Sequence, residues 1–119
     1  MASCDINLVL NAEVSGTTAT HIGSARILTG SNTVVSFRGM FGSSIEDNQT
    51  GTLEVKRYTG GATITELKAS GIGLQDISGS SILLPGPDAN INNDWYDFYA
   101  SGSQADATVL IKGIKIVLQ

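Results

Sequence analysis

The C-terminal end of the chain constrains the fold more than any other segment. An aromatic stretch, Asp94 to Ala100, is followed by a polar turn and then by an almost unbroken run of β-branched and aliphatic residues from Ala107 to Leu118. Such residues favour strands because their side chains pack well on a pleated surface. We expect two strands here that close a sandwich or a barrel.

Short strands and turns also account for the rest of the chain. Alternation is clearest from Asp5 to Val14, where every second residue is apolar, which predicts a strand with one face toward a core. Thr52 to Tyr58 alternates in the same way, and the Gly60-Gly61 pair that follows is a tight-turn signal before Ala62 to Ala69. The last two segments are expected to form an antiparallel hairpin.

Weaker signals predict the remaining strands. They fall at His21 to Leu28, Thr33 to Phe41, Gln75 to Ser78 and Ile82 to Leu84. With turn signals about every 8 to 12 residues, this pattern predicts an all-β fold: an antiparallel β-sandwich, jelly-roll-like, of eight to nine strands. At 119 residues the chain suits a single domain spanning 1–119.

The charges narrow the classes of partner. Seven Lys and Arg stand against 11 Asp and Glu, which gives a formal net charge of −4. The basic residues are scattered along the chain, whereas a nucleic-acid binder needs a basic stripe that displaces counterions from phosphates. We therefore expect no nucleic-acid partner.

Apolar runs and cysteines set further limits. No stretch approaches the roughly 18 continuous apolar residues of a membrane span, and the N-terminus has neither the charged nor the apolar region of a secretory signal. Cys4 is the only cysteine, so an intramolecular disulfide and a thiolate zinc cluster are both excluded. We expect a protein made in a cytoplasm, with no membrane partner.

The last strand is apolar on both faces if its alternation is unbroken. Val109 and Ile111 then point to one side, and Ile114 and Ile116 to the other. An ordinary sandwich strand has one polar face that is exposed to solvent. This strand has none, so either an overlying loop or a second subunit has to cover one of its two faces. We assign these four residues to a candidate subunit interface.

No catalytic constellation emerges from the residue patterns. His21 is the only histidine, no GxSxG motif is present, and nothing pairs any two of Glu46, Asp47, Glu54, Glu66 and Asp97. We predict no enzyme activity, no catalytic residues and no cofactor. The alternative, a small hydrolase, would require His21 beside a nucleophile and a carboxylate.

The oxygen-rich stretch DANINND superficially resembles a calcium loop. It lacks the Gly at the sixth position and the Glu at the twelfth that an EF-hand requires. An irregular calcium site built from Asp88, Asn90 and Asp94 stays open, but Asp and Asn also stabilise turns by bonding to nearby backbone. We predict no metal site.

The aromatic segment has two interpretations. In a strand, Trp95 and Tyr99 share one face, and Tyr96 and Phe98 share the other. Aromatic clusters commonly form cores because they bury large apolar areas. The alternative is a ligand platform, on which Trp95 and Tyr99 would stack against sugar rings.

These last residues also carry a family resemblance. Trp95 to Leu118 resembles the closing strands of small jelly-roll structural proteins of tailed bacteriophages, in which an aromatic strand and a turn precede an apolar strand containing Lys and Gly. The family includes capsid decoration or cement proteins. The resemblance implies a structural virion protein on the capsid surface, made in the host cytoplasm. It implies the major capsid protein as partner and a homo-oligomer, with a trimer favoured. A tail-fibre or spike module and a carbohydrate-binding β-sandwich module are the alternatives.

Overall fold

Every regular element in the described part of the chain is a β-strand. The computed structural model describes residues 4–27, 33–42, 49–57, 63–70, 75–79, 82–84 and 95–118. The strands are β1 (Cys4–Ser15), β2 (Thr20–Arg26), β3 (Thr33–Phe41), β4 (Thr50–Arg57), β5 (Thr63–Ser70), β6 (Gln75–Ser78), β7 (Ile82–Leu84), β8 (Trp95–Gly102) and β9 (Thr108–Leu118).

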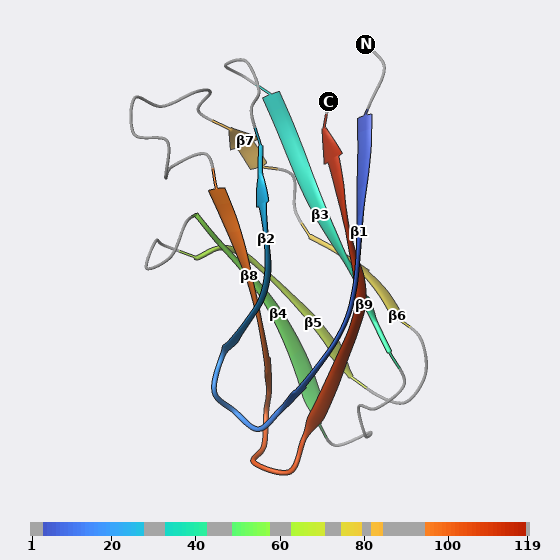
Figure 1. Ribbon diagram of the computed structural model, residues 1–119, viewed down its shortest axis with the longest axis vertical. Helices are drawn as coiled ribbons and strands as arrows, with labels where there is room; N and C mark the ends of the chain where they lie inside the picture. The colour runs from blue at the N-terminus through green and yellow to red at the C-terminus, as the bar shows by residue number, and fades with distance from the viewer. Residues whose placement is uncertain are drawn as a thin grey trace.

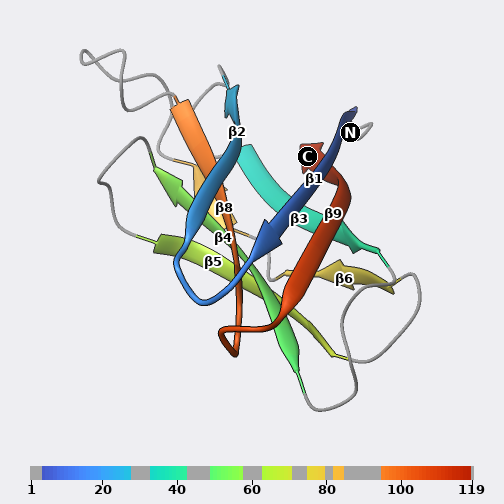
Figure 2. The same ribbon diagram turned by 60° about the horizontal axis from the view of Figure 1, so that its bottom comes forward.

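The strands form two antiparallel sheets that lie face to face (Figure 1 and Figure 2). Sheet A has the strand order β1-β9-β3-β6, and sheet B has the order β2-β8-β4-β5. β7 also pairs with β3, opposite Thr33 to Val35, whereas β6 lies opposite Arg38 to Phe41. β6 and β7 pair with successive parts of β3, so together they form one interrupted strand. Counted in this way, the described strands occupy eight positions in the sandwich.

The pairing of the strands is nested. β1 pairs with β9, β2 with β8, β3 with β6 and β7, and β4 with β5. The chain therefore runs as one long hairpin that is rolled up, which is the jelly-roll form of the β-sandwich. The predicted fold class is confirmed. The predicted hairpin is confirmed in its strands β4 and β5, while its Gly60-Gly61 turn lies outside the described residues.

The core fills the space between the sheets. Phe37 of β3 lies with its ring centroid 6.1 Å from that of Phe98 and 6.3 Å from that of Tyr96, both on β8, and all three rings are buried. The alternation expected from Asp5 to Val14 is confirmed, because its apolar side packs on the core and its other side, which includes Val9, is exposed. Burial of each large apolar side chain stabilises the fold by about 1.5–3 kcal/mol.

A β-bulge at Lys112 breaks the alternation that we expected along the C-terminal strand. Consecutive residues of β3, Met40 and Phe41, pair with Gly113 and Ile111, so β3 has no residue opposite Lys112. One extra residue in a strand reverses the faces of the side chains beyond it. The apolar residues before and after the bulge consequently point to the same side of sheet A.

The bulge corrects the predicted subunit interface. The four residues assigned to that interface are buried in the core of a single subunit: Val109, Ile111, Ile114 and Ile116. A partner subunit has no access to side chains that are already enclosed between the two sheets. The two apolar faces inferred for this strand are therefore one face, and a subunit interface has to be sought elsewhere.

Strand β1 matches the bulge with a distortion of its own. Leu10 and Asn11 both lie opposite Lys112. Asn11 has a φ of 49°, in the left-handed region that Asn tolerates better than most residues. The Lys112 ammonium donates a 3.0 Å hydrogen bond to the Asn11 Oδ1. The two strands thus remain paired on both sides of the irregularity.

Candidate functional site

Strand β8 divides its aromatic rings between the core and the outer face of sheet B. Tyr96 and Phe98 are buried, whereas Trp95 is 40% exposed. Tyr99 is half-buried between the two strands that flank β8. The ring centroid of His21 on β2 lies 5.3 Å from that of Tyr99, and the Nζ of Lys56 on β4 lies 5.1 Å from the Tyr99 centroid.

Trp95 and Tyr99 therefore do not form one open platform. The Tyr99 ring is covered by side chains from both neighbouring strands, as an interior ring of a sheet face would be. The two positions are four steps apart along the strand, a span of about 13 Å. Trp95 keeps exposed ring surface at the start of β8, where Arg26 of β2 is its cross-strand neighbour. Of the two rings named for the alternative, a sugar platform, Trp95 is the exposed one and Tyr99 is half-buried.

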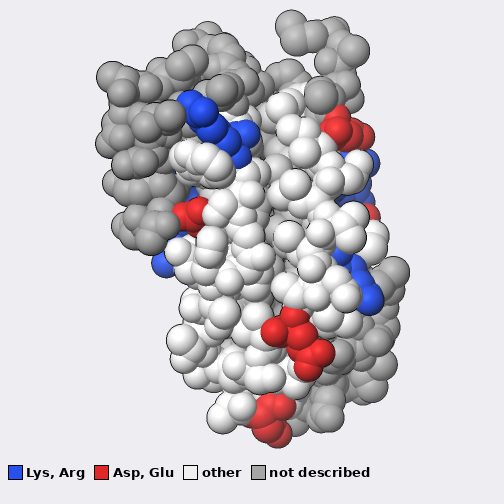
Figure 3. All heavy atoms as spheres, viewed as in Figure 1, with Lys and Arg blue, Asp and Glu red and all other residues white. Residues whose placement is uncertain are grey.

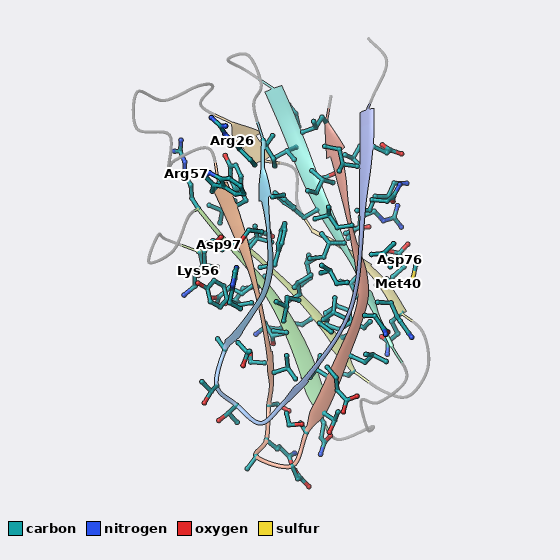
Figure 4. All side chains as sticks on the ribbon, viewed as in Figure 1. Arg26, Met40, Lys56, Arg57, Asp76 and Asp97 are labelled. Atoms are coloured by element: carbon teal, nitrogen blue, oxygen red, sulfur yellow. The ribbon has the colours of Figure 1, made fainter. Side chains whose placement is uncertain are left out.

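A polar cluster lies beside Tyr99 on the same outer face, in the region where Figure 4 labels Asp97 and Lys56. Asp97 is only 4% exposed. The Ser24 hydroxyl donates a 2.5 Å hydrogen bond to the Asp97 Oδ1. The His21 Nε2 lies 2.8 Å from the Ser24 Oγ and 3.7 Å from the Asp97 Oδ1. Cross-strand pairing of Ser24 with Asp97 positions the hydroxyl, and a register shift between His21 and Gly23 brings the imidazole beside it.

The structure thus brings together the three residue types of a nucleophilic triad, in a different arrangement. In a triad the serine and the carboxylate bind opposite nitrogens of the imidazole, so that the base can take the serine proton. Here both oxygens lie on the Nε2 side of His21, and the Ser24 hydroxyl donates its hydrogen bond to Asp97. This geometry holds β2 to β8 and does not prepare the Ser24 oxygen for attack.

Two of the carboxylates considered in the sequence face each other across sheet B. Glu54 of β4 pairs with Glu66 of β5. Each has a lysine of its own strand nearby, with Lys56 Nζ 3.2 Å from Glu54 and Lys68 Nζ 3.8 Å from Glu66. The described residues hold no group of three His, Cys, Asp or Glu that could bind a metal ion. Several sequence candidates lie outside the described residues: Glu46, Asp47, Asp88, Asn90 and Asp94.

A groove of about 210 Å³ lies on the outer face of sheet A. Its floor is the backbone around Gly113, and its walls include Val9 of β1 and Met40 of β3. Val9 is 88% exposed and Met40 is 39% exposed. Val9 lies on the polar side of β1, between Asn7 and Asn11. An apolar residue at a polar position of an alternating strand is the signal that marks this groove.

Charged side chains surround the groove in pairs; Figure 4 labels Met40 and Asp76 on this side of the molecule. The Arg38 guanidinium donates two hydrogen bonds to the Asp76 carboxylate, of 2.8 Å and 3.3 Å. Lys115 Nζ lies 3.2 Å from the Asp5 Oδ2. Lys112 also lines the groove and donates to the uncharged Asn11 amide, so the rim carries a small net positive charge.

The visible surface carries few charges of either sign. Figure 3 shows small, separate groups of basic and acidic side chains on a largely uncharged face. Among the described residues, no helix has the length and apolar character needed to span a membrane.

Solved structures share this jelly-roll class of fold. No family model and no curated protein sequence matches the chain. The VP2 subviral particle of infectious bursal disease virus resembles it with a TM-score of 0.58 and 13% identity, over 98% of this chain and 32% of that chain. Eiger TNF from S. frugiperda has a TM-score of 0.55 and 10% identity, over 98% and 92%. CBM35 from Cellvibrio japonicus has a TM-score of 0.50 and 12% identity, over 95% and 92%.

These likenesses establish the architecture. This chain spans about a third of the VP2 chain, so it corresponds to one part of that protein. Identities of 10–13% show a common fold and leave the biological role to be argued separately. The fold is a jelly roll of a kind that also occurs in a viral VP2 particle.

Proposed function

We propose that this protein is a structural component of a virus particle, and that it decorates the capsid surface of a tailed bacteriophage. The observation that carries the proposal is the nested strand order β1-β9-β3-β6 over β2-β8-β4-β5, a fold similar to that in the VP2 subviral particle. The resemblance of Trp95 to Leu118 to the closing strands of phage structural proteins supports it independently. The proposed location is the capsid surface, reached after synthesis in the host cytoplasm.

The proposed mechanism is thermodynamic. A protein that binds the assembled shell, and not its separated subunits, stabilises the shell by mass action. The proposed partner is the major capsid protein, whose neighbouring copies one decoration protein would bridge. Self-association would strengthen this effect, because a second contact made by a linked copy benefits from a high effective concentration. The family resemblance favours a trimer for that homo-oligomer.

We propose no enzymatic step. His21, Ser24 and Asp97 form a cluster with the residue types of a hydrolase. In this cluster the Ser24 hydroxyl donates its hydrogen bond to the Asp97 carboxylate. A His21→Ala variant should therefore bind capsids as the unaltered protein does. Loss of a measurable hydrolytic activity in this variant would contradict the proposal.

Capsid binding tests the proposed function directly. Shells of the parent phage assembled without this protein should bind the purified chain at a fixed number of copies per shell. Bound protein should raise the temperature at which the shells are disrupted. Absence of both effects, together with binding to tails, would assign the chain to a tail fibre or spike instead.

A carbohydrate-binding module is the second candidate, and the exposure of Trp95 is the observation that favours it. Aromatic faces stack on sugar rings, and CBM35 from Cellvibrio japonicus shares the fold. Trp95 is the only tryptophan, so its fluorescence reports ligand binding without interference. A saturable change in that fluorescence on titration with a glycan would favour this candidate. The same glycan should also be bound on a glycan array, and Trp95→Ala should lose that binding. No response to any glycan would remove it.

A further inference from the structure

A projecting side chain and a hollow lie next to each other on the outer face of sheet A. Val9 of β1 and Met40 of β3 both pair with Gly113, from opposite sides of β9. Because Gly113 has no side chain, the middle of this cross-strand row is empty, and the groove lies there. Val9 and Met40 are two of the three large apolar side chains exposed in the described part of the chain.

The backbone keeps this hollow open. A Cβ atom added at Gly113 would lie 2.8 Å from the Leu8 carbonyl oxygen, closer than side-chain carbons approach backbone oxygens. The two strands would have to separate to accommodate it. Gly113 therefore permits the close approach of β1 and β9 and, at the same time, leaves space for an apolar group from another molecule.

The charges around the groove indicate what kind of surface could cover it. Arg38 is paired with Asp76, and Lys115 with Asp5, within one subunit. Removing an ion pair from water costs less free energy than removing an unpaired charge from water. Lys112, which is bonded to the uncharged Asn11 amide, leaves one net positive charge at the rim, which repels a strongly basic partner and is too little to select a strongly acidic one. A near-neutral surface with an apolar projection fits better, and the same face of a second copy has both properties.

We propose that two copies of this chain pair through the outer faces of sheet A about a two-fold axis. Val9 of each copy enters the hollow over Gly113 of the other, beside Met40. A two-fold interface is self-complementary, so the projection and the hollow are filled on both copies at once. The inference rests on the self-association included in the proposed function, and it replaces the favoured trimer with a dimer.

The size of this face suits a dimer. The four neighbouring strands β1, β9, β3 and β6 have 12, 11, 9 and 4 residues, and at about 4.8 Å spacing they cover about 570 Å². Two such faces bury about 1,100–1,200 Å², which is at the lower end of the range for specific interfaces. Much of this face is polar, and association has a cost of its own, so only part of the buried area contributes to affinity. We therefore expect a reversible dimer.

The mass of the full chain in solution tests this pairing. Sedimentation equilibrium should show a dimer for the unaltered protein. Val9→Lys places an ammonium group where the apolar hollow would receive it, and should raise the dimer dissociation constant at least about 30-fold. Thr63→Lys is the matched control, because it replaces another exposed β-branched strand residue, on sheet B. It should leave the dimer unchanged. At dilutions where the unaltered protein and both variants are monomeric, Val9→Lys should unfold at the same temperature as the unaltered protein.

Met40→Lys provides a second test of the same surface and should also weaken the dimer. An unaltered chain that stays monomeric at its highest soluble concentration would overturn the pairing. A trimer would also overturn it, and so would a dimer that Val9→Lys does not weaken. Capsid binding separates this inference from the proposed function. A Val9-dependent dimer that fails to bind capsids would refute only the decoration role, whereas capsid binding by a strict monomer would refute only the pairing.

Discussion

Phe37 of β3 and Phe98 of β8 meet edge to face across the sandwich, with their ring centroids 6.1 Å apart. Each ring comes from a strand with neighbours on both sides, since β3 lies between β9 and β6 and β8 lies between β2 and β4. Aromatic pairs of this geometry contribute about 0.5–1.5 kcal/mol beyond the burial of their area. The contact joins the two sheets at their centre, and it sets which residues of β8 face outward.

Replacing Phe37 with Ala should lower the free energy of unfolding by about 3–5 kcal/mol, because it leaves a cavity between the sheets. Trp95→Ala removes a larger ring from an exposed position and should lower the free energy of unfolding by less than about 1 kcal/mol. Urea unfolding at low temperature measures both changes. Equal losses in the two variants would contradict the assignment of Phe37 to the core and Trp95 to the surface.

The sequence was sufficient to predict the strands and their class of fold, and the reason is visible in β1. Its apolar residues fall at every second position, and a period of two has only one structural meaning. The C-terminal strand was harder because seven of its eleven residues from Thr108 to Leu118 are apolar, and in a regular alternation they fall on both faces. In such a run an extra residue can be accommodated without changing the pattern. The Lys112-Gly113 pair is the one local sign of a bulge in this strand.

The polar cluster and the groove could not be predicted from local patterns. Ser24 and Asp97 are 73 positions apart in the chain, and they meet because β2 pairs with β8. The nested order of strands decides that pairing, and strand spacing alone is compatible with several orders. The groove depends on the same kind of information, since Val9 and Met40 become neighbours only when β9 lies between their strands.

Two single-residue deletions in β9 test the bulge. Deleting Lys112 should preserve the fold, because the remaining residues then alternate regularly and keep Ile111 and Ile114 facing the core. Deleting Lys115 removes the same residue type but turns Ile116 outward, and should cost at least about 2 kcal/mol. Thermal unfolding compares the two variants. If the Lys112 deletion were the more destabilising one, the bulge would be placed wrongly.

The cluster on the outer face of sheet B should contribute to stability. Ser24→Ala removes a hydroxyl donor from the Asp97 carboxylate, which is 4% exposed, and hydrogen bonds to buried charged groups contribute about 1.5–3 kcal/mol. We expect a loss of that size in the free energy of unfolding. His21→Ala should cost less than about 1 kcal/mol, because half of the His21 side chain is exposed to water. The reverse order in urea unfolding would show that His21, and not Ser24, is the main partner of Asp97.

The ion pair between Arg38 and Asp76 links stability to the proposed pairing of subunits. Within one subunit their side chains are 40% and 46% exposed, and exposed pairs of this kind contribute less than about 1 kcal/mol. A double-mutant cycle with Arg38→Met and Asp76→Asn, measured in the Val9→Lys background that keeps the chain monomeric, should give a coupling energy in that range. In the unaltered dimer the opposing face should displace water from the pair, which strengthens the interaction between the two charges. The coupling energy should then exceed the monomer value and should respond less to added salt. Identical coupling energies and salt dependence in both backgrounds would mean that the Arg38–Asp76 pair stays in water, and that the outer face of sheet A remains uncovered.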